Sequence, residues 1–184
     1  IGADSVKVLR ICNEINKELA QKQKIIVLVQ LFEFVKSNTG EISEQELAFI
    51  TAVSESFYIP NDEYELIRHF TLNTFDSIPS DKHLLVVNNS RLPKISKNKH
   101  IYSEYLTGNI WICHVPSAGM YFLRYIGENE LFLNGQMIQQ DKVFTLNTGT
   151  SVRITILNHC ISVILSAFLK KTPSMNVLFL KRKK

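Results

Sequence analysis

The sequence lacks the long apolar run that a membrane-spanning helix requires. Such a helix needs about 20 consecutive apolar residues. The best candidate, residues 154–169, is shorter and contains Asn158, His159 and Ser162. We therefore expect no transmembrane segment in this chain. The chain begins with Ile1, and its first fifteen residues do not have the form of a secretory signal. We expect it to be a processed protein or a part of a longer one.

Cysteine is scarce as well, with only Cys12, Cys113 and Cys160 in the 184 residues. The number is odd, the three are far apart in the sequence, and no CxxC pair occurs. This pattern supports neither a disulfide framework nor a zinc site. We expect small, buried thiols in a reducing compartment.

Sequence motifs that carry common chemistry are also missing. We find no GxxxxGK[ST], GxGxxG, HExxH or GxSxG, and residues 147–151 (NTGTS) lack the lysine and the following helix of a phosphate loop. The histidines show no ligand spacing with cysteine or carboxylate and are expected to be structural or solvated: His69, His83, His100, His114 and His159. No catalytic, cofactor-binding or metal-ligating residue is predicted, and an enzyme with a dispersed site is the remaining alternative.

The segment around Gly40 has the spacing of half a calcium-binding loop. With Gly40 at the sixth position, Glu46 occupies the twelfth, as such a loop requires. Val35, Ser37 and Thr39 would then occupy the first, third and fifth positions. Because calcium needs several carboxylate oxygens, we predict a tight turn between two helices and no metal site.

Charge divides the chain into two dissimilar halves. Residues 1–80 contain seven Lys and Arg against twelve Asp and Glu, a net charge of −5. Residues 81–184 contain fourteen against five, a net charge of +9. This asymmetry indicates two units with different surfaces. The hydrophobic share of 45% is ordinary for a globular protein, so disorder is not expected over most of the chain.

Apolar residues recur at helical spacing in the first half. We predict helices over residues 4–20, 21–36, 43–58 and from Asn61 or Asp62 to about Phe70. The second should be the buried centre of a small bundle, because it is apolar on nearly every side. Ser43 and Glu46 form the pattern of a capping box. Residues 73–80 have the composition of a linker.

Strand patterns dominate the second half. We predict strands over residues 84–87, 109–115, 120–126, 130–133, 142–146, 151–156 and 176–180. Residues 116–119 (PSAG) and Asn134-Gly135 supply hairpin turns. The even spacing favours an antiparallel sandwich or barrel. Ile161, Ile164, Leu165 and Phe168 return to helical spacing and predict a short closing helix.

Positive charge concentrates in a predicted loop over residues 90–99 and in the tail over residues 170–184. A solvated surface is the common explanation of such clusters. The alternative is an anionic partner, either nucleic acid, lipid headgroups or a phosphopeptide. The candidate residues for such a partner are Arg91, Lys94, Lys97 and Lys99. No RNP-like, KH or helix-turn-helix pattern favours nucleic acid specifically.

Residues 4–70 resemble the tellurite-resistance-type helical domain through a buried helix, a GEIS-E turn (residues 40–44 and Glu46) and a capped third helix. Members of that group can bind metal through acidic residues near the turn, and here Glu41 and Glu46 stand in matching places.

Residues 110–154 resemble a forkhead-associated β-sandwich through LFLNGQMI, with its Asn134-Gly135, and KVFTLNTGTSVRI. The Gly-Arg and Ser-x-x-His pairs that contact phosphothreonine in that family cannot be placed in this sequence.

In this order, the two modules resemble the accessory region of a group of large bacterial ABC transporter ATP-binding proteins. The expectation is an α+β fold, with an all-α helical bundle over residues 1–78, a small antiparallel β-sandwich over residues 82–170, and a linker or the start of a further domain over residues 171–184. The resemblance implies a non-catalytic regulatory or docking region. ATP and Mg²⁺ would bind only to a downstream ATPase domain, which, with transporter subunits, would be its partner. It further implies a cytoplasmic position at the inner face of the cell membrane.

Overall fold

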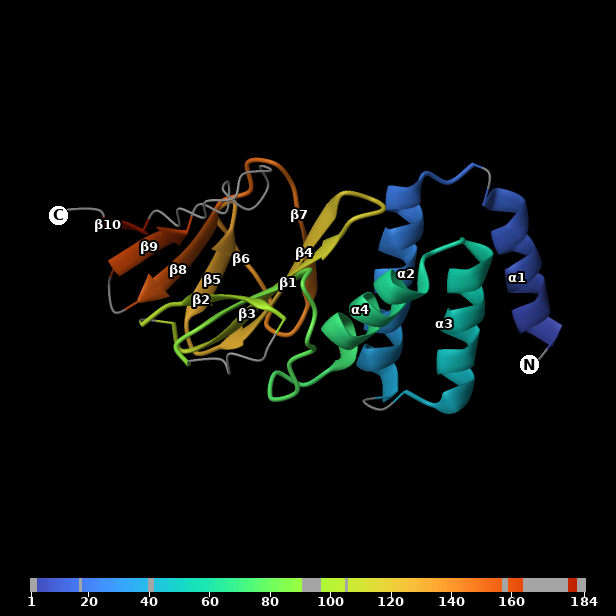
Figure 1. The fold of residues 1–184 in the computed structure, drawn as a ribbon, viewed down its shortest axis with the longest axis horizontal. Coiled ribbons are helices and arrows are strands. Elements are labelled where there is room, and N and C mark those ends of the chain that lie inside the picture. The colour runs from blue at the N-terminus through green and yellow to red at the C-terminus, as the bar shows by residue number, and fades with distance from the viewer. Residues whose placement is uncertain are drawn as a thin grey trace. The chain divides into compact units, whose positions relative to one another are not determined.

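In a computed structural model, the residues that the structure describes form four helices followed by two mostly antiparallel β-sheets (Figure 1). The described residues are 3–16, 18–39, 42–90, 97–104, 106–156, 159–163 and 179–181. They divide into two compact units. One comprises Ile1–Pro79 with Cys113–Met120, and the other comprises Ser80–Ile112 with Tyr121–Lys184. The predicted α+β class is thereby confirmed.

The helices of the first unit are α1 (Ala3–Ile15), α2 (Gln21–Thr39), α3 (Glu44–Ser56) and α4 (Asn61–Leu72). α2 packs against α3 and α4, and α1 packs against α3. The rings of Phe32 and Tyr64 lie 5.7 Å apart in the core, and the Tyr64 hydroxyl lies 2.7 Å from Thr51 Oγ1. Burial of the Phe32 side chain and the satisfied Tyr64 hydroxyl together stabilise the α2–α4 contact.

Two details of the helical prediction are wrong. The predicted central helix is not buried on every side, since Phe34 of α2 is 64% exposed. The fourth helix is not capped by Asn61 or Asp62, because Asn61 already belongs to the helix and Pro60 is the N-cap, without a side-chain hydrogen bond. Proline suits this place because it needs no hydrogen-bond partner for a backbone N–H.

The capping box of α3 is confirmed. The Ser43 side chain accepts a hydrogen bond from the Glu46 amide at 3.2 Å, and the Glu46 carboxylate accepts one from the Ser43 amide at 3.0 Å. These hydrogen bonds lower the pKa of the Glu46 carboxyl. Two backbone donors at the start of the helix are satisfied reciprocally.

The described strands, most of whose residues belong to the second unit, form two five-stranded sheets. In sheet A the order is β2 (Lys99–Tyr102), β1 (Leu84–Asn88), β3 (Gly108–Val115), β4 (Met120–Gly127) and β7 (Val143–Leu146). In sheet B the order is β10 (Phe179–Lys181), β9 (His159–Val163), β8 (Val152–Ile156), β5 (Glu130–Leu133) and β6 (Gln136–Met137). The inner faces of both sheets share one core, which includes Leu85, Ile112 and Leu123 from sheet A and Leu131 and Ile154 from sheet B.

The predicted hairpins are confirmed. Asn134 and Gly135, with φ of 51° and 85°, turn the chain between β5 and β6. Both residues adopt the left-handed region that a two-residue hairpin turn requires. The Asn134 side chain also accepts a hydrogen bond from the Ser151 amide at 2.9 Å, which ties the turn to the residue before β8.

The closing helix predicted from Ile161 onward is wrong where the structure describes it. Ile161 lies in β9 and pairs antiparallel with Ile154 of β8. Its β-branched side chain favours a strand, and the adjacent β8 supplies the hydrogen bonds that a helix would have made internally. Residues 164–168 lie outside the described residues. So does most of the segment 171–184, of which only β10 is described.

Three strands within residues 97–163 were not predicted: β9, part of which was expected to be helical, and β2 and β6. β2 begins at Lys99, within the segment expected to be a basic loop, and pairs parallel with β1. β6 contains only two residues. The sheets are therefore mostly, but not entirely, antiparallel.

Candidate interaction site

The structure describes two of the four predicted anion-binding residues. Lys97 and Lys99 are both exposed, and Lys99 is the first residue of β2. The Lys97 amide donates to Ser80 Oγ at 3.2 Å, and Asn98 Oδ1 accepts from the Asp81 amide at 2.6 Å. These bonds hold the end of the basic segment beside the residues that precede β1. Arg91 and Lys94 lie outside the described residues.

Three polar side chains from neighbouring strands form a connected cluster. This polar trio consists of Asn88 on β1, His100 on β2 and Asn109 on β3. Asn88 Nδ2 donates to Asn109 Oδ1 at 2.7 Å, and Asn88 Oδ1 lies 2.9 Å from His100 Nε2. Asn88 is only 3% exposed. A buried amide is stabilised only when its donors and acceptors are paired, so the trio fixes β1 against both of its neighbours.

The hydrogen bonds of Asn88 determine the protonation of His100. Asn88 Oδ1 also accepts from the Ser90 amide at 3.1 Å, which identifies that atom as the amide oxygen. An oxygen acceptor requires a donor, so His100 Nε2 carries a proton. Burial lowers the pKa of His100 from its ordinary 6.5. Burial therefore favours the neutral form of the ring.

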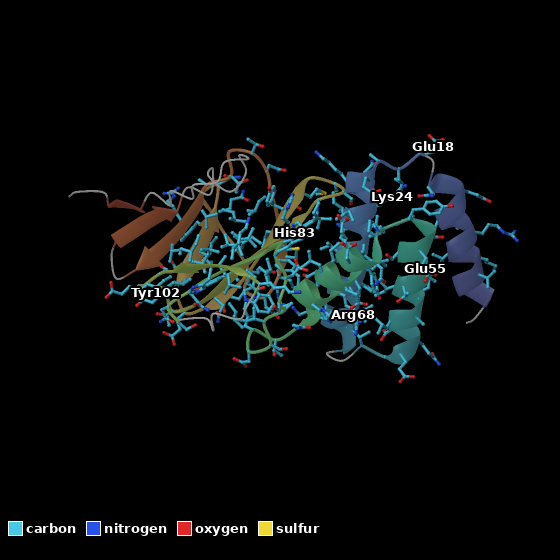
Figure 2. All side chains as sticks on the ribbon, in the orientation of Figure 1. Glu18, Lys24, Glu55, Arg68, His83 and Tyr102 are labelled. Carbon is cyan, nitrogen blue, oxygen red and sulfur yellow. The ribbon has the colours of Figure 1, made fainter. Side chains whose placement is uncertain are left out.

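Strand β2 lies at the edge of sheet A (Figure 1). Its side chains alternate between the two faces of the sheet. Ile101 packs against the shared core, whereas Tyr102 is 53% exposed and projects away from the ribbon (Figure 2). The strand thus combines an apolar contact on one face with an exposed aromatic ring on the other, next to two lysines.

The sequence analysis missed an ion pair between buried Arg124 and the partly exposed Asp141. Arg124 of β4 is 2% exposed, and its Nε donates to Asp141 Oδ1 at 2.8 Å. Its guanidinium carbon lies 5.6 Å from the centre of the Trp111 ring. The single charged residue within residues 120–126 (MYFLRYI) could have indicated this ion pair, because a charge in a buried strand requires a partner. The partner itself, seventeen residues away, has no local signal.

A buried carboxylate lies in the helical unit. Glu63 of α4 is 6% exposed, and its Oε1 accepts from the Ser117 amide at 2.7 Å. Glu63 Oε2 accepts a short hydrogen bond from the Ser117 hydroxyl, and Gln21 Nε2 donates to the same hydroxyl at 3.2 Å. The turn between β3 and β4, which belongs to this unit, is thereby tied to α4 and α2. Glu63 and Ser117 are 54 residues apart, so no sequence pattern joins them.

The calcium-like turn contributes a structural contact. Gly40 and Glu41 lie outside the described residues, and the Glu46 carboxylate is occupied by Ser43 through its amide and, at 2.7 Å, its hydroxyl. Among the described side chains, no group of three or more His, Cys, Asp and Glu could hold a metal ion. Cys12 and Cys113 are buried and not disulfide-bonded, and burial raises the pKa of the Cys12 thiol.

Comparison with known proteins finds no matching family model, no matching curated protein and no matching solved structure. Among the described residues, no helix has both the length and the apolar character needed to cross a bilayer.

Proposed function

We propose that this chain is the non-catalytic regulatory or docking region of an ABC-type ATP-binding protein. The proposal rests on the resemblance drawn from the sequence, and one structural observation supports it. A four-helix unit precedes a unit of two packed β-sheets, which is the order of modules that the resemblance requires. In this proposal ATP and Mg²⁺ bind to a downstream domain at the cytoplasmic face of the membrane. That domain and the transporter subunits are the partners.

The contacts of the buried ionisable residues agree with a docking role. Glu63 is occupied by the Ser117 amide and hydroxyl, and Arg124 by Asp141. A general acid or base must be able to exchange a proton with a substrate, within about 3 Å or through one water. Glu63 holds a turn in place and Arg124 holds a strand in place, so both residues contribute to stability.

The gene that encodes the chain provides the direct test. A phosphate loop of the GxxxxGK[ST] type within the next few dozen codons after Lys184 would support the proposal. A stop codon directly after Lys184 would contradict it. Reproducible ATP hydrolysis by the purified chain, with contaminants excluded, would overturn the non-catalytic assignment.

A second candidate function is the binding of an anionic or phosphorylated partner by the basic segment. The specific observation is the exposure of Lys97 and Lys99 at the start of an edge strand, in the half of the chain whose net charge is +9. Titration of a phosphopeptide, an RNA and anionic vesicles at two salt concentrations tests it. We expect affinity for one of them to fall steeply with salt. No binding of any of them at low salt would remove this candidate.

A further inference from the structure

Strand β2 is one of the two edge strands of sheet A. β2 pairs with β1 through the register Leu85 with Lys99 to Asn88 with Tyr102, and among the described residues no strand pairs with its other side. An edge strand presents backbone N–H and C=O groups that can pair with another extended chain. The pairing with β1 and the hydrogen bond between His100 and Asn88 hold β2 in place.

The charges around β2 indicate which chain would pair there. Lys97 and Lys99 are exposed at the start of the strand, and Glu104, two residues after its end, is exposed as well. Lysine on an edge strand normally discourages pairing between copies of a protein, because like charges repel. The same lysines favour a partner of opposite charge.

We propose that β2 binds an extended acidic peptide, which adds to sheet A as a sixth strand beside Lys99–Tyr102. This inference rests on the proposed binding of an anionic partner and specifies the partner and the geometry. Backbone hydrogen bonds supply affinity, and side chains at alternate positions supply specificity, as in other strand-addition complexes.

The faces of β2 define the sequence of the peptide. Lys99 and Ile101 lie on one face, and Ile101 is partly buried against the core of the unit. The peptide therefore carries an acidic residue beside Lys99 and, two residues away on the same face, an apolar residue beside Ile101. On the other face a residue packs beside the exposed ring of Tyr102 (Figure 2). The apolar residue would extend the existing core at its open edge.

The experiment uses a blocked ten-residue peptide with alternating Glu and Val on one face and Thr on the other. Two further peptides have the same sequence but carry backbone N-methyl groups. In one peptide the odd-numbered residues are methylated, and in the other the even-numbered residues are methylated. Strand addition uses hydrogen bonds along only one edge of the peptide. We expect one methylated peptide to lose binding and the other to retain it, in fluorescence-anisotropy titrations of the full chain at low salt.

Charge-reversal variants locate the site. Lys99→Glu should weaken binding about 5- to 10-fold at low salt, because one exposed ion pair is replaced by a repulsion. Arg153→Glu, at an exposed position on β8 of sheet B, is the matched control and should leave the affinity unchanged within about twofold. Hydrogen exchange should show added protection of amides within residues 99–102 when the peptide is bound. An unchanged urea midpoint would verify that Lys99→Glu folds normally.

The outcomes separate this inference from the function on which it rests. Equal binding of both methylated peptides, or equal weakening by the Lys99 and Arg153 substitutions, would overturn strand addition at β2 and leave anion binding intact. Binding of RNA or anionic vesicles with no binding of any peptide would likewise overturn strand addition at β2 and leave anion binding intact. No binding of any anionic probe at low salt would overturn both.

Discussion

Three glycines of the β unit allow backbone strain to be separated from steric overlap. A Cβ on Gly108 would lie 2.2 Å from the Ile126 carbonyl oxygen, and Gly108 has φ of +133°. A Cβ on Gly127 would lie 2.2 Å from the Thr107 carbonyl oxygen, but φ of Gly127 lies outside the left-handed region. Gly149 has φ of +88° with no atom within 4 Å of such a Cβ. Gly108→Ala therefore tests steric overlap and backbone strain together. Gly127→Ala tests overlap alone, and Gly149→Ala tests strain alone.

The expected losses of unfolding free energy follow from these geometries. Gly149→Ala should cost about 1–2 kcal/mol, the strain of a left-handed residue with a side chain. Gly127→Ala should cost about 1–3 kcal/mol, because the Cβ would overlap the Thr107 carbonyl oxygen, the Gly108 backbone and the Tyr125 hydroxyl, which would have to shift. Gly108→Ala combines both effects and should cost about 2–5 kcal/mol. A small domain has only about 5–15 kcal/mol in total, so this variant should be the least stable.

Urea denaturation followed by tryptophan emission measures these losses. Trp111 is the single tryptophan, it is fully buried, and it belongs to the β unit, so its emission reports the unit that contains all three glycines. We expect the urea midpoint to be lower for Gly127→Ala than for Gly149→Ala, and lowest for Gly108→Ala. The slope of unfolding free energy against urea concentration should be unchanged. If Gly108→Ala lost no more stability than Gly149→Ala, the close approach of Gly108 to Ile126 would be refuted.

The remaining predictions concern single contacts. Asp141→Asn should destabilise the β unit by about 1–3 kcal/mol in the same urea assay, because buried Arg124 loses the charge of this partner; a loss below about 0.5 kcal/mol would contradict this role. Ser43→Ala should cost about 0.5–2 kcal/mol by thermal denaturation followed by circular dichroism, and Ser43→Asp, which can still cap, should cost less. The NMR titration of His100 should have a midpoint below 6.5. Because its pKa is lower folded than unfolded, the stability it contributes should fall as pH drops from about 6.5 toward the folded pKa, and an Asn88→Ala variant should alter that midpoint.

Local patterns predicted well where neighbouring residues alone determine the structure. The Ser43–Glu46 capping box spans four residues, and its hydrogen bonds are those expected from the sequence. Asn134-Gly135 forms its turn because few other residue pairs adopt positive φ at both positions without strain. In both cases the partners that satisfy the backbone are within a few residues of each other.

Contacts between distant residues account for the errors. Ile161 has helical spacing to Ile164 and Leu165. In the structure, however, it lies in β9 and pairs with Ile154 of the neighbouring strand β8. β2 was hidden in a basic segment, because only its parallel pairing with β1 makes Lys99–Tyr102 a strand. The polar trio could not be predicted for the same reason. Asn88 and His100 are separated by twelve residues, and only the crossover between β1 and β2 brings their side chains together.

This dependence explains why charge alone could not define the site. The sequence places four cations within nine residues, which is equally compatible with a solvated loop and with a binding surface. The structure places Lys99 on a strand whose outer side pairs with no other strand among the described residues, with Ile101 packed against the core and Tyr102 exposed. A loop offers an anion only charge, whereas an edge strand also offers a fixed row of backbone donors and acceptors. The pairing of β2 with β1, rather than the number of lysines, is therefore what makes an extended acidic peptide a specific partner.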